Sequence, residues 1–409
     1  MPPHILIVAD GRSPTAHSWI RNIQSLGLVV SLISTFPCEP PLGLKHFHVL
    51  PIAFSRYSKE PSSQTQTSPR KRPKTWVKRF APLLQFIRYR LGPLTLPLHV
   101  KTYQNWVKEI QPDLVHALRI PFEGMLASTT PKGVPCVMAT WGNDLTLHAR
   151  GSLLMRRFTR RCLQRADGLT SDTHRDTRLA HNWGLEHSVP TLVVPGSGGI
   201  DLEKFQSASI FNADLYGIPK TGAWVVNPRG YRPGSVHQEV FFTAIPKVLS
   251  RCPETHFLCP NLAGNKEAEK WIEDFEIRAS THLLPQLAQP DLWSLFKESA
   301  VFVSPSSHDG TPNTFLESIA SGCFPVVGDI ESLREWITNG VNGFLVNPHD
   351  PDALADAIVN ALQQPALQQS AAEHNQRVIK SRASLDATLP QIKSFYAQFI
   401  EVSNTQEHR

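Results

Sequence analysis

Short apolar strands, each followed by a polar loop, recur along the first half of the chain. Residues 4–9 (HILIVA) are continuously apolar, a helix is expected over 15–26 with Gly27 as its stop, and LVVSLIS forms the next strand. This order predicts the opening of a doubly wound parallel sheet. Four further segments complete it: PDLVHALRI, VPCVMATWGNDL, RADGLTSDT and TLVVPGSGGID. Their polar loops meet at the carboxyl edge of the sheet, where ligands of such sheets bind.

The length predicts more than one hydrophobic core. A chain of 409 residues suits two domains of about 200 residues each. We expect a first domain over 1–195, a second over 196–385, and a terminal helix over 386–409 that returns to the first domain. Residues 55–75 are polar and rich in Ser, Thr and Pro, which predicts a mobile loop inside the first domain.

Positive charge is concentrated in the first domain. Residues 1–195 carry 25 Lys and Arg against 11 Asp and Glu, whereas the remainder carries 16 against 24. Two basic segments, 70–92 and 150–165, fit an anionic membrane surface, an anionic acceptor, a nucleic acid or a solvated helix face. Aromatic residues among the cations of 70–92 favour the membrane. Nucleic acid is disfavoured because no recognition motif accompanies the charge.

The sequence contains neither a recognisable targeting signal nor closely spaced cysteines. There is no apolar run of about 18 residues and no basic region before a long apolar core at the N-terminus. The six cysteines lie far apart without a C-x-x-C pair, which favours reduced thiols and disfavours a zinc site. We therefore expect a cytoplasmic protein, with peripheral binding to the inner face of the membrane as the alternative that the basic segments leave open.

The segment 301–348 carries the clearest chemistry. VFVSP predicts a strand, SSHDGTPN a loop, and TFLESIASG a helix that closes on Gly322. The helix start offers backbone N–H groups and a positive dipole end to a diphosphate lying over 310–314, that is Gly310, Thr311, Pro312, Asn313 and Thr314. Glu317 is placed to accept hydrogen bonds from ribose hydroxyls, and Asp309 from a sugar. The alternative is a helix-capping Asp309 with a solvated Glu317.

Together with its flanking residues, this acid pair resembles a known signature. A carboxylate, seven residues and then Glu, with SPS, SGCFPVV and NGVNGFLV around them, is similar to the E-x7-E motif of retaining GT-B glycosyltransferases of family 4, with Asp309 replacing the first Glu. DLVHALRI and VVPGSGGIDLEKF also resemble segments of that family. The resemblance implies two Rossmann-like, doubly wound parallel-sheet domains facing a central cleft, with the donor in the second domain and the acceptor in the first.

The same resemblance implies a reaction. A sugar passes from a nucleoside-diphosphate sugar to a hydroxyl of an acceptor lipid, glycan or small metabolite, with retention at the anomeric carbon. No metal and no other cofactor is expected, because a helix N-terminus and cationic side chains stabilise the leaving diphosphate.

Two departures from the family pattern concern candidate site residues. ATWGNDL aligns with T-x-H-G-x-D, so Trp141 stands where many members carry a histidine, and it is expected either to stack on a sugar or simply to pack. Asp144 matches the motif. His17 and His116 lie on neighbouring loops, and for each histidine a structural role is as compatible with the sequence as a catalytic one.

The second departure lies in VVNPRGYRPG. Arg229 matches the arginine of the family, but Gly234 stands at its lysine, and Arg232 is the candidate replacement against the diphosphate. The predicted catalytic set is therefore Arg229, Arg232, Asp309, His116 and Asp144, and the predicted acceptor-side set is His17, Trp141 and Asp144.

Two alternatives and one look-alike complete the predictions. A nucleotide-sugar epimerase of the same fold would share the donor pocket, and a degenerate relative would bind the nucleotide sugar without catalysis. The D-x-D in DPDAL suggests a metal site, but it precedes ALADAIVNAL, so Asp350 or Asp352 is expected to cap a helix.

Overall fold

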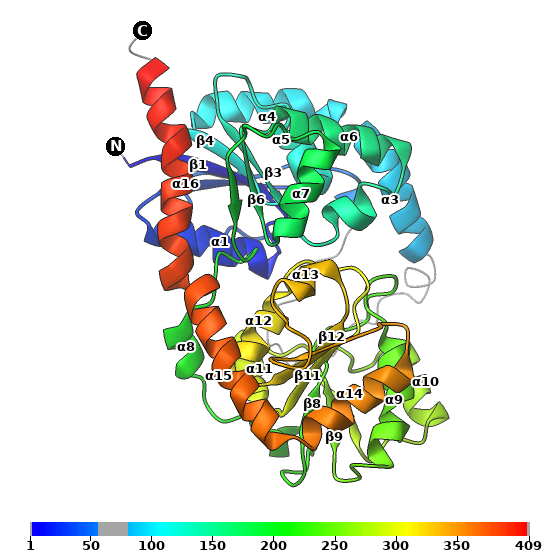
Figure 1. Ribbon diagram of the computed structural model, residues 1–409. Helices are drawn as coiled ribbons and strands as arrows, with labels where there is room; N and C mark the ends of the chain where they lie inside the picture. Colours follow the sequence, from blue (N-terminus) through cyan, green and yellow to red (C-terminus); the bar gives the residue numbers. More distant parts are fainter. Residues whose placement is uncertain (1, 56–80, 407–409) are drawn as a thin grey trace. The chain divides into compact units, whose positions relative to one another are not determined.

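The computed structural model describes residues 2–55 and 81–406 and divides into two compact units (Figure 1). The first unit comprises Met1–Gly198 and Leu389–Arg409, and the second comprises Gly199–Thr388. Each division falls three residues after the expected boundary. All but the first residue of the expected mobile loop 55–75, and the basic residues 70–80, lie outside the described residues.

The first unit is built on a parallel sheet of seven strands in the order β3-β2-β1-β4-β5-β6-β7. The strands are β1 (His4–Ala9), β2 (Val29–Ser34), β3 (Phe47–Val49), β4 (Leu114–Ala117), β5 (Cys136–Thr140), β6 (Gly168–Ser171) and β7 (Thr191–Val193). The six strands expected from the apolar pattern are all present. The seventh, β3, was missed because it has three half-buried residues, too few for a periodic signal.

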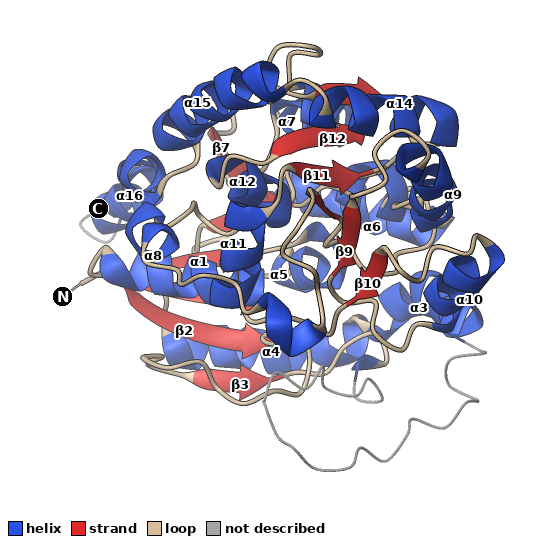
Figure 2. Ribbon diagram, turned by 90° about the horizontal axis from the view of Figure 1, so that it is seen from below, coloured by secondary structure: helices blue, strands red, loops and turns tan. Residues whose placement is uncertain are grey.

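Helices lie on both faces of this sheet (helices blue, strands red in Figure 2). They are α1 (Pro14–Ser25), α3 (Ala81–Thr95), α4 (Pro97–Ile110), α5 (Met125–Ala127), α6 (Leu153–Arg165), α7 (His174–Trp183) and α16 (Leu385–Gln406), with helical turns at Ile120–Gly124 and Asp144–His148. Ser13 caps α1 by accepting the N–H of Ala16, and Pro14 occupies the first turn, so the helix begins one residue before the expected start.

Alternating residues of β1 serve the two faces. Leu6 and Val8 pack with α4, α5, α6 and α7, whereas Ile5 and Ile7 pack with α1 and α16. The side chains that α16 contributes to this second core are Ile392, Phe395, Tyr396 and Phe399. The terminal helix therefore covers one face of the first unit's sheet, and all of the strand is buried.

The second unit holds a parallel sheet of six strands in the order β10-β9-β8-β11-β12-β13. The strands are β8 (Trp224–Val226), β9 (His256–Cys259), β10 (Thr281–Leu283), β11 (Val301–Ser304), β12 (Phe324–Gly328) and β13 (Phe344–Val346). The helices are α8 (Leu202–Gln206), α9 (Gln238–Leu249), α10 (Lys266–Asp274), α11 (Gln289–Glu298), α12 (Asn313–Ala320), α13 (Glu331–Arg334), α14 (Pro351–Leu362) and α15 (Pro365–Arg382), with a turn at Ala213–Tyr216.

Strand β11 shows how this sheet is buried on both sides. Val301 and Val303 pack with α9 and α14, whereas Phe302 packs with α11 and α12. The expected cap of α14 is present, because an Asp350 carboxylate oxygen accepts the N–H groups of Asp352 and Ala353, each at 3.0 Å. The D-x-D look-alike is thus a helix start.

Across the described residues, no helix combines the length and the apolar character that crossing a bilayer requires. All six cysteines are free thiols.

Candidate functional site

The loop between β11 and α12 places the first predicted carboxylate. The helix begins at Asn313 with Pro312 in the capping position, so Asp309 lies four residues before the helix and does not cap it. Its Oδ1 accepts the N–H of Gly310 at 3.1 Å, and its backbone carbonyl accepts Ser332 Oγ at 2.8 Å. The helix ends near Gly322, whose φ of 98° is the left-handed conformation that glycine favours.

Arg229 joins this loop to the end of β8. Its Nη2 forms an ion pair with Asp309 Oδ2, and its Nη1 donates to Thr314 Oγ1 at 3.2 Å. The side chains of Arg229 and Asp309 are only 6% and 16% exposed, respectively. The sequence placed Asp309 on the sugar and Arg229 on the diphosphate, whereas the structure pairs them with each other. This pairing compensates both buried charges and fixes the two loops against one another, and it leaves the N–H of Arg229 Nε without a hydrogen-bond partner.

The loop that carries Arg229 is held by a buried amide network. Asn227 Oδ1 accepts the N–H of Arg229 at 3.3 Å, and Asn227 Nδ2 donates to Gln238 Oε1 at 2.8 Å. Gln238 Nε2 in turn donates to the carbonyl of Gly230 at 2.7 Å. Because α9 supplies Gln238, the start of that helix sets the position of the Arg229 loop.

Arg232 and Gly234 lie in an exposed part of the same loop. Gly234 has a φ of 85°, so a side chain at this position is strained. A lysine, which the resembled family carries at this position, would be strained in this backbone conformation. The prediction that Arg232 replaces it stays a prediction.

Glu317 lies one turn into α12 and is buried, with 6% of the residue exposed. Its Oε1 accepts Gln289 Nε2 at 2.8 Å from the start of α11. Burial raises the pKa of Glu317 to about 7, against the opposing effects of Gln289 and Trp293. A solvated helix glutamate is therefore the wrong interpretation. The carboxyl is poised to change charge near neutral pH.

Several residues that support this site were not predicted. The indole N–H of Trp336 donates to Thr311 Oγ1 at 3.0 Å in a buried contact, and Ser332 and Gln289 hold the two carboxylate positions as described above. These residues lie 23 to 28 positions from their partners in sequence. No local spacing links them, so only the folded chain reveals them.

In the first unit, Asp144 joins the loops that follow β4 and β5. Its buried carboxylate accepts Arg119 Nε at 2.9 Å, the N–H of Trp141 at 3.1 Å and the N–H of Ile120 at 3.4 Å. Burial raises its pKa, and Arg119 opposes this shift. These bonds make Asp144 a residue that positions two loops at the sheet edge.

His116 occupies an interior position in β4 and is fully buried. Its Nδ1 lies 2.7 Å from the Tyr396 hydroxyl and its Nε2 lies 3.2 Å from Thr170 Oγ1, and burial lowers its pKa to about 3. The structure thus gives His116 a structural role, and we withdraw it as a catalytic candidate. The sequence predicted a loop position for His116. Its partner Tyr396 lies 280 positions away in α16, so no local pattern indicated that this histidine is buried.

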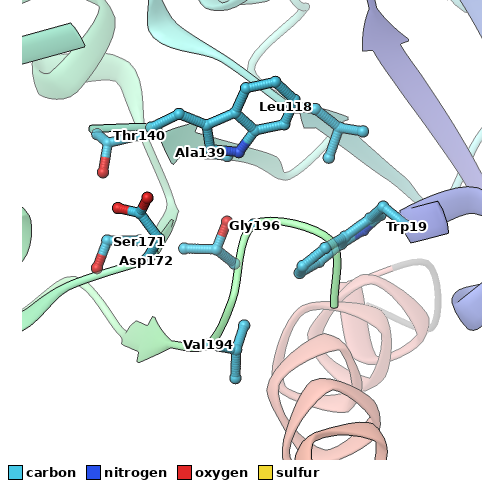
Figure 3. A pocket seen from close by; sticks show the side chains of 10 residues that line it. Trp19, Leu118, Ala139, Thr140, Ser171, Asp172, Val194 and Gly196 are labelled. Carbon is cyan, nitrogen blue, oxygen red and sulfur yellow. The ribbon is translucent and has the colours of Figure 1, made fainter. Parts of the chain in front are cut away.

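Trp141 and His17, the other two predicted acceptor-side residues, also belong to the first unit. His17 Nε2 is 2.6 Å from the carbonyl of Gly11, so this histidine holds the loop after β1. Trp141 borders a cavity of about 10 Å³, the space of one water molecule. In Figure 3, Thr140 and Asp172 lie on one side of this cavity and Trp19 on the other.

The outer face of α6 forms a basic surface. Its arginines and Leu153 are exposed and line a shallow hollow of about 400 Å³: Leu153, Arg156, Arg157, Arg160, Arg161 and Gln164. Buried Met155, Thr159, Cys162 and Leu163 fix the opposite face to the core. Most of the second predicted basic segment is therefore one face of α6, whereas Arg150 precedes the helix and Arg165 pairs with Asp167.

Known proteins match both units. Residues 10–196 match the family model described as Glycosyl transferase 4-like domain, and residues 237–378 match Glycosyl transferases group 1. The phosphatidyl-myo-inositol mannosyltransferase of Mycobacterium tuberculosis is 27% identical over 198 residues, which are 47% of this chain and 50% of that protein. The D-inositol 3-phosphate glycosyltransferase of Thermobispora bispora is 28% identical over 146 residues, 35% and 32% of the two chains. The matched part thus spans half or less of these relatives.

Solved structures match the whole chain in fold. A sucrose-phosphate synthase from Thermosynechococcus elongatus superposes with a TM-score of 0.71 at 14% identity, covering 98% of this chain and 100% of that one. Anabaena HepE in complex with UDP gives a TM-score of 0.68 at 15% identity, with coverage of 97% and 100%.

The two parallel-sheet units and the superposed structures define the GT-B fold, and a glycosyltransferase family model matches each unit. The first unit matches the model of the glycosyl transferase 4-like domain, and the second unit matches the model of the glycosyl transferases of group 1.

Proposed function

We propose that this protein transfers a sugar from a nucleoside-diphosphate sugar to an acceptor hydroxyl with retention at the anomeric carbon. The observation that carries the proposal is the arrangement around α12, where the Arg229–Asp309 pair precedes the helix and buried Glu317 lies one turn inside it. Structures of the similar-fold HepE protein are complexes with UDP and with UDP-glucose, which supports a nucleotide-sugar donor.

In this proposal the second unit binds the donor. The diphosphate lies over Gly310–Thr314 at the start of α12, where the helix dipole and Arg229 favour negative charge. Glu317, once ionised, accepts hydrogen bonds from the ribose hydroxyls. Asp309, steadied by Arg229, accepts from hydroxyls of the transferred sugar.

The chemistry asked of these residues is stabilisation of the leaving diphosphate and alignment of the sugar. Negative charge builds on the bridging oxygen as the glycosidic bond breaks, and Arg229 with the amides of the helix start is placed to offset it. Retention is proposed from the resemblance of the Asp309-x7-Glu317 segment to the motif of the retaining family, and NMR of the product anomer, followed from the first turnovers, tests it.

We also propose that the reaction needs no metal. No group of three or more His, Cys, Asp or Glu side chains is arranged to hold an ion in the part of the chain that the structure describes. Activity that persists in excess chelator is the expected result. Activity that is lost with chelator and restored by a divalent ion contradicts the proposal.

Replacing Glu317 tests the donor site directly. Glu317→Gln keeps the size and the contact with Gln289 but removes the charge, so donor affinity should fall about tenfold or more, the loss of one or more charge-assisted hydrogen bonds. Isothermal titration with a panel of nucleotide sugars measures this change.

The matched control is Glu267→Gln, which makes the same change on the exposed face of α10. Donor affinity should be unaltered in this variant. Equal affinity and turnover in Glu317→Gln and the wild-type protein would refute the assignment of Glu317.

A further inference from the structure

Three arginines gather at one edge of the first unit's sheet. In the strand order, β1 lies between β2 and β4, so the loops after β1 and β4 leave the sheet in different directions. Such a switch point is where open α/β sheets bind ligands. Arg12 follows β1 and Arg119 follows β4, while Arg88 of α3 shares the ring of Phe36 with Arg12.

Two of these arginines are neutralised by carboxylates. Arg12 makes two bonds to Asp10, Nε to Oδ1 and Nη2 to Oδ2, each at 2.9 Å. Arg119 Nε donates to Asp144 Oδ1 at 2.9 Å. Because each already has a carboxylate partner, neither Arg12 nor Arg119 requires an additional anion.

Arg88 differs from both. Its Nε is buried without a hydrogen-bond partner, and within the described residues no carboxylate lies within 4 Å of its guanidinium. The buried carboxyl of Glu123, which acts on Arg88 through space, is bonded instead to Thr35 Oγ1 at 2.7 Å. The Arg88 side chain is half-buried, so part of it stays accessible.

Two aromatic rings hold the Arg88 guanidinium. Its central carbon lies 4.9 Å from the ring centroid of Phe36 and 4.8 Å from that of Phe122. Phe122 has a φ of 69°, which is rare for a bulky residue, and its backbone is thus held in an unfavourable conformation. Rings at the faces of a guanidinium leave its in-plane N–H donors able to bind. At Arg88 the two terminal amino groups, Nη1 and Nη2, are the donors for a bidentate anion, because Nε is buried.

We propose that Arg88, held by Phe36 and Phe122, binds a phosphate ester on the acceptor. The acceptor is then an anionic molecule, and its phosphate binds near the carboxyl ends of β1 and β4 in the first unit. This inference rests on the proposed transfer reaction, since only a transferase needs an acceptor there. The phosphate belongs either to a soluble ester or to a lipid headgroup.

The experiment uses the full chain and sn-glycerol 3-phosphate as the soluble probe, with isothermal titration as the measurement. Arg88→Gln should weaken binding about tenfold or more, the loss of at least one charge-assisted hydrogen bond. The control Arg21→Gln makes the same charge change on the exposed side of α1 and should leave affinity unchanged. Should Arg88→Gln fail to fold, Arg88→Lys replaces it, because it keeps the charge and loses the planar fork.

A second arm uses phosphatidylcholine vesicles with and without phosphatidylinositol. Capture by the phosphatidylinositol vesicles that depends on Arg88 identifies a lipid source, and Arg88-dependent binding of glycerol 3-phosphate alone identifies a soluble one. Equal binding by the wild-type protein and the Arg88 variant, or no binding by the wild-type protein in either arm, overturns the inference.

Donor affinity, measured on the same samples, separates this inference from the proposed function. Arg88→Gln should bind the nucleotide sugar as the wild-type protein does. A wild-type protein that binds no nucleotide sugar refutes the proposed function, and the phosphate arms still decide the role of Arg88.

Discussion

Glu317 is the residue whose charge state should control donor binding. Its pKa is raised to about 7 by burial, so near neutral pH it is a mixture of the acid and the carboxylate. Ribose hydroxyls donate to the carboxylate, and donor binding therefore favours the ionised form and releases a proton. Donor affinity should rise as the pH increases from about 6 to about 8 and then level off.

Titration in two buffers of different ionisation enthalpy measures the released proton. Glu317→Gln has no carboxyl to ionise, so its donor affinity should lose this part of the pH dependence. A wild-type affinity that falls between pH 6 and pH 8 would contradict the assigned direction.

Gly234 gives a second prediction for a single residue. The resembled family carries lysine here, but the φ of 85° makes any side chain unfavourable. Gly234→Lys should lower the free energy of unfolding by about 1 kcal/mol or more, measured by urea titration. Gly133→Lys, at an exposed position with no positive φ and with open space around it, should be nearly neutral. A stabilising Gly234→Lys would show that the loop adopts another conformation.

At the scale of elements, α6 presents a charged face that its own core residues fix in orientation. Arg157 and Arg161 project on this exposed face beside Leu153, and an anionic surface would be favoured there. The double variant Arg157→Gln, Arg161→Gln should reduce flotation with anionic liposomes at low salt, and high salt should reduce flotation of the wild-type protein.

Neutral liposomes are the control for this measurement, since charge is the proposed attraction. Wild-type protein that does not float with anionic liposomes at low salt would remove the membrane proposal for α6. If the double variant keeps its catalytic activity in solution, α6 contributes to membrane binding and not to the reaction itself.

How much of these elements the sequence predicts depends on the range of the contacts involved. Strand β11, helix α12 and the cap at Asp350 follow from neighbouring residues, so the local pattern was sufficient. The Arg229–Asp309 pair spans 80 positions and was predicted only as two separate donor contacts. His116 was misjudged because its partner Tyr396 comes from a helix whose docking site no local pattern specifies.

At the scale of the whole molecule, the first unit depends on a helix from the far end of the sequence. Phe395 and Phe399 of α16 pack against β6 at Gly168, where even a methyl group would lie 2.5 Å from the Phe399 ring. Phe395→Ala removes a buried ring from this core and should cost about 3–5 kcal/mol of unfolding free energy in the first unit.

Hydrogen exchange read by mass spectrometry locates this loss. Peptides from 1–198 should exchange faster in Phe395→Ala, while peptides from 199–388 keep their wild-type protection. Faster exchange confined to the second unit would contradict the assignment of α16 to the first.

The return of α16 also bears on biosynthesis. The second unit is an insertion whose two ends are tied together, because Ile200 donates its N–H to the Ala383 carbonyl and accepts the N–H of Leu385. On the ribosome this unit is complete before α16 has been made, while one face of the first unit's sheet still waits for its cover. The later half of the chain can therefore finish folding before the earlier half, and the uncovered apolar face is where a chaperone would be needed.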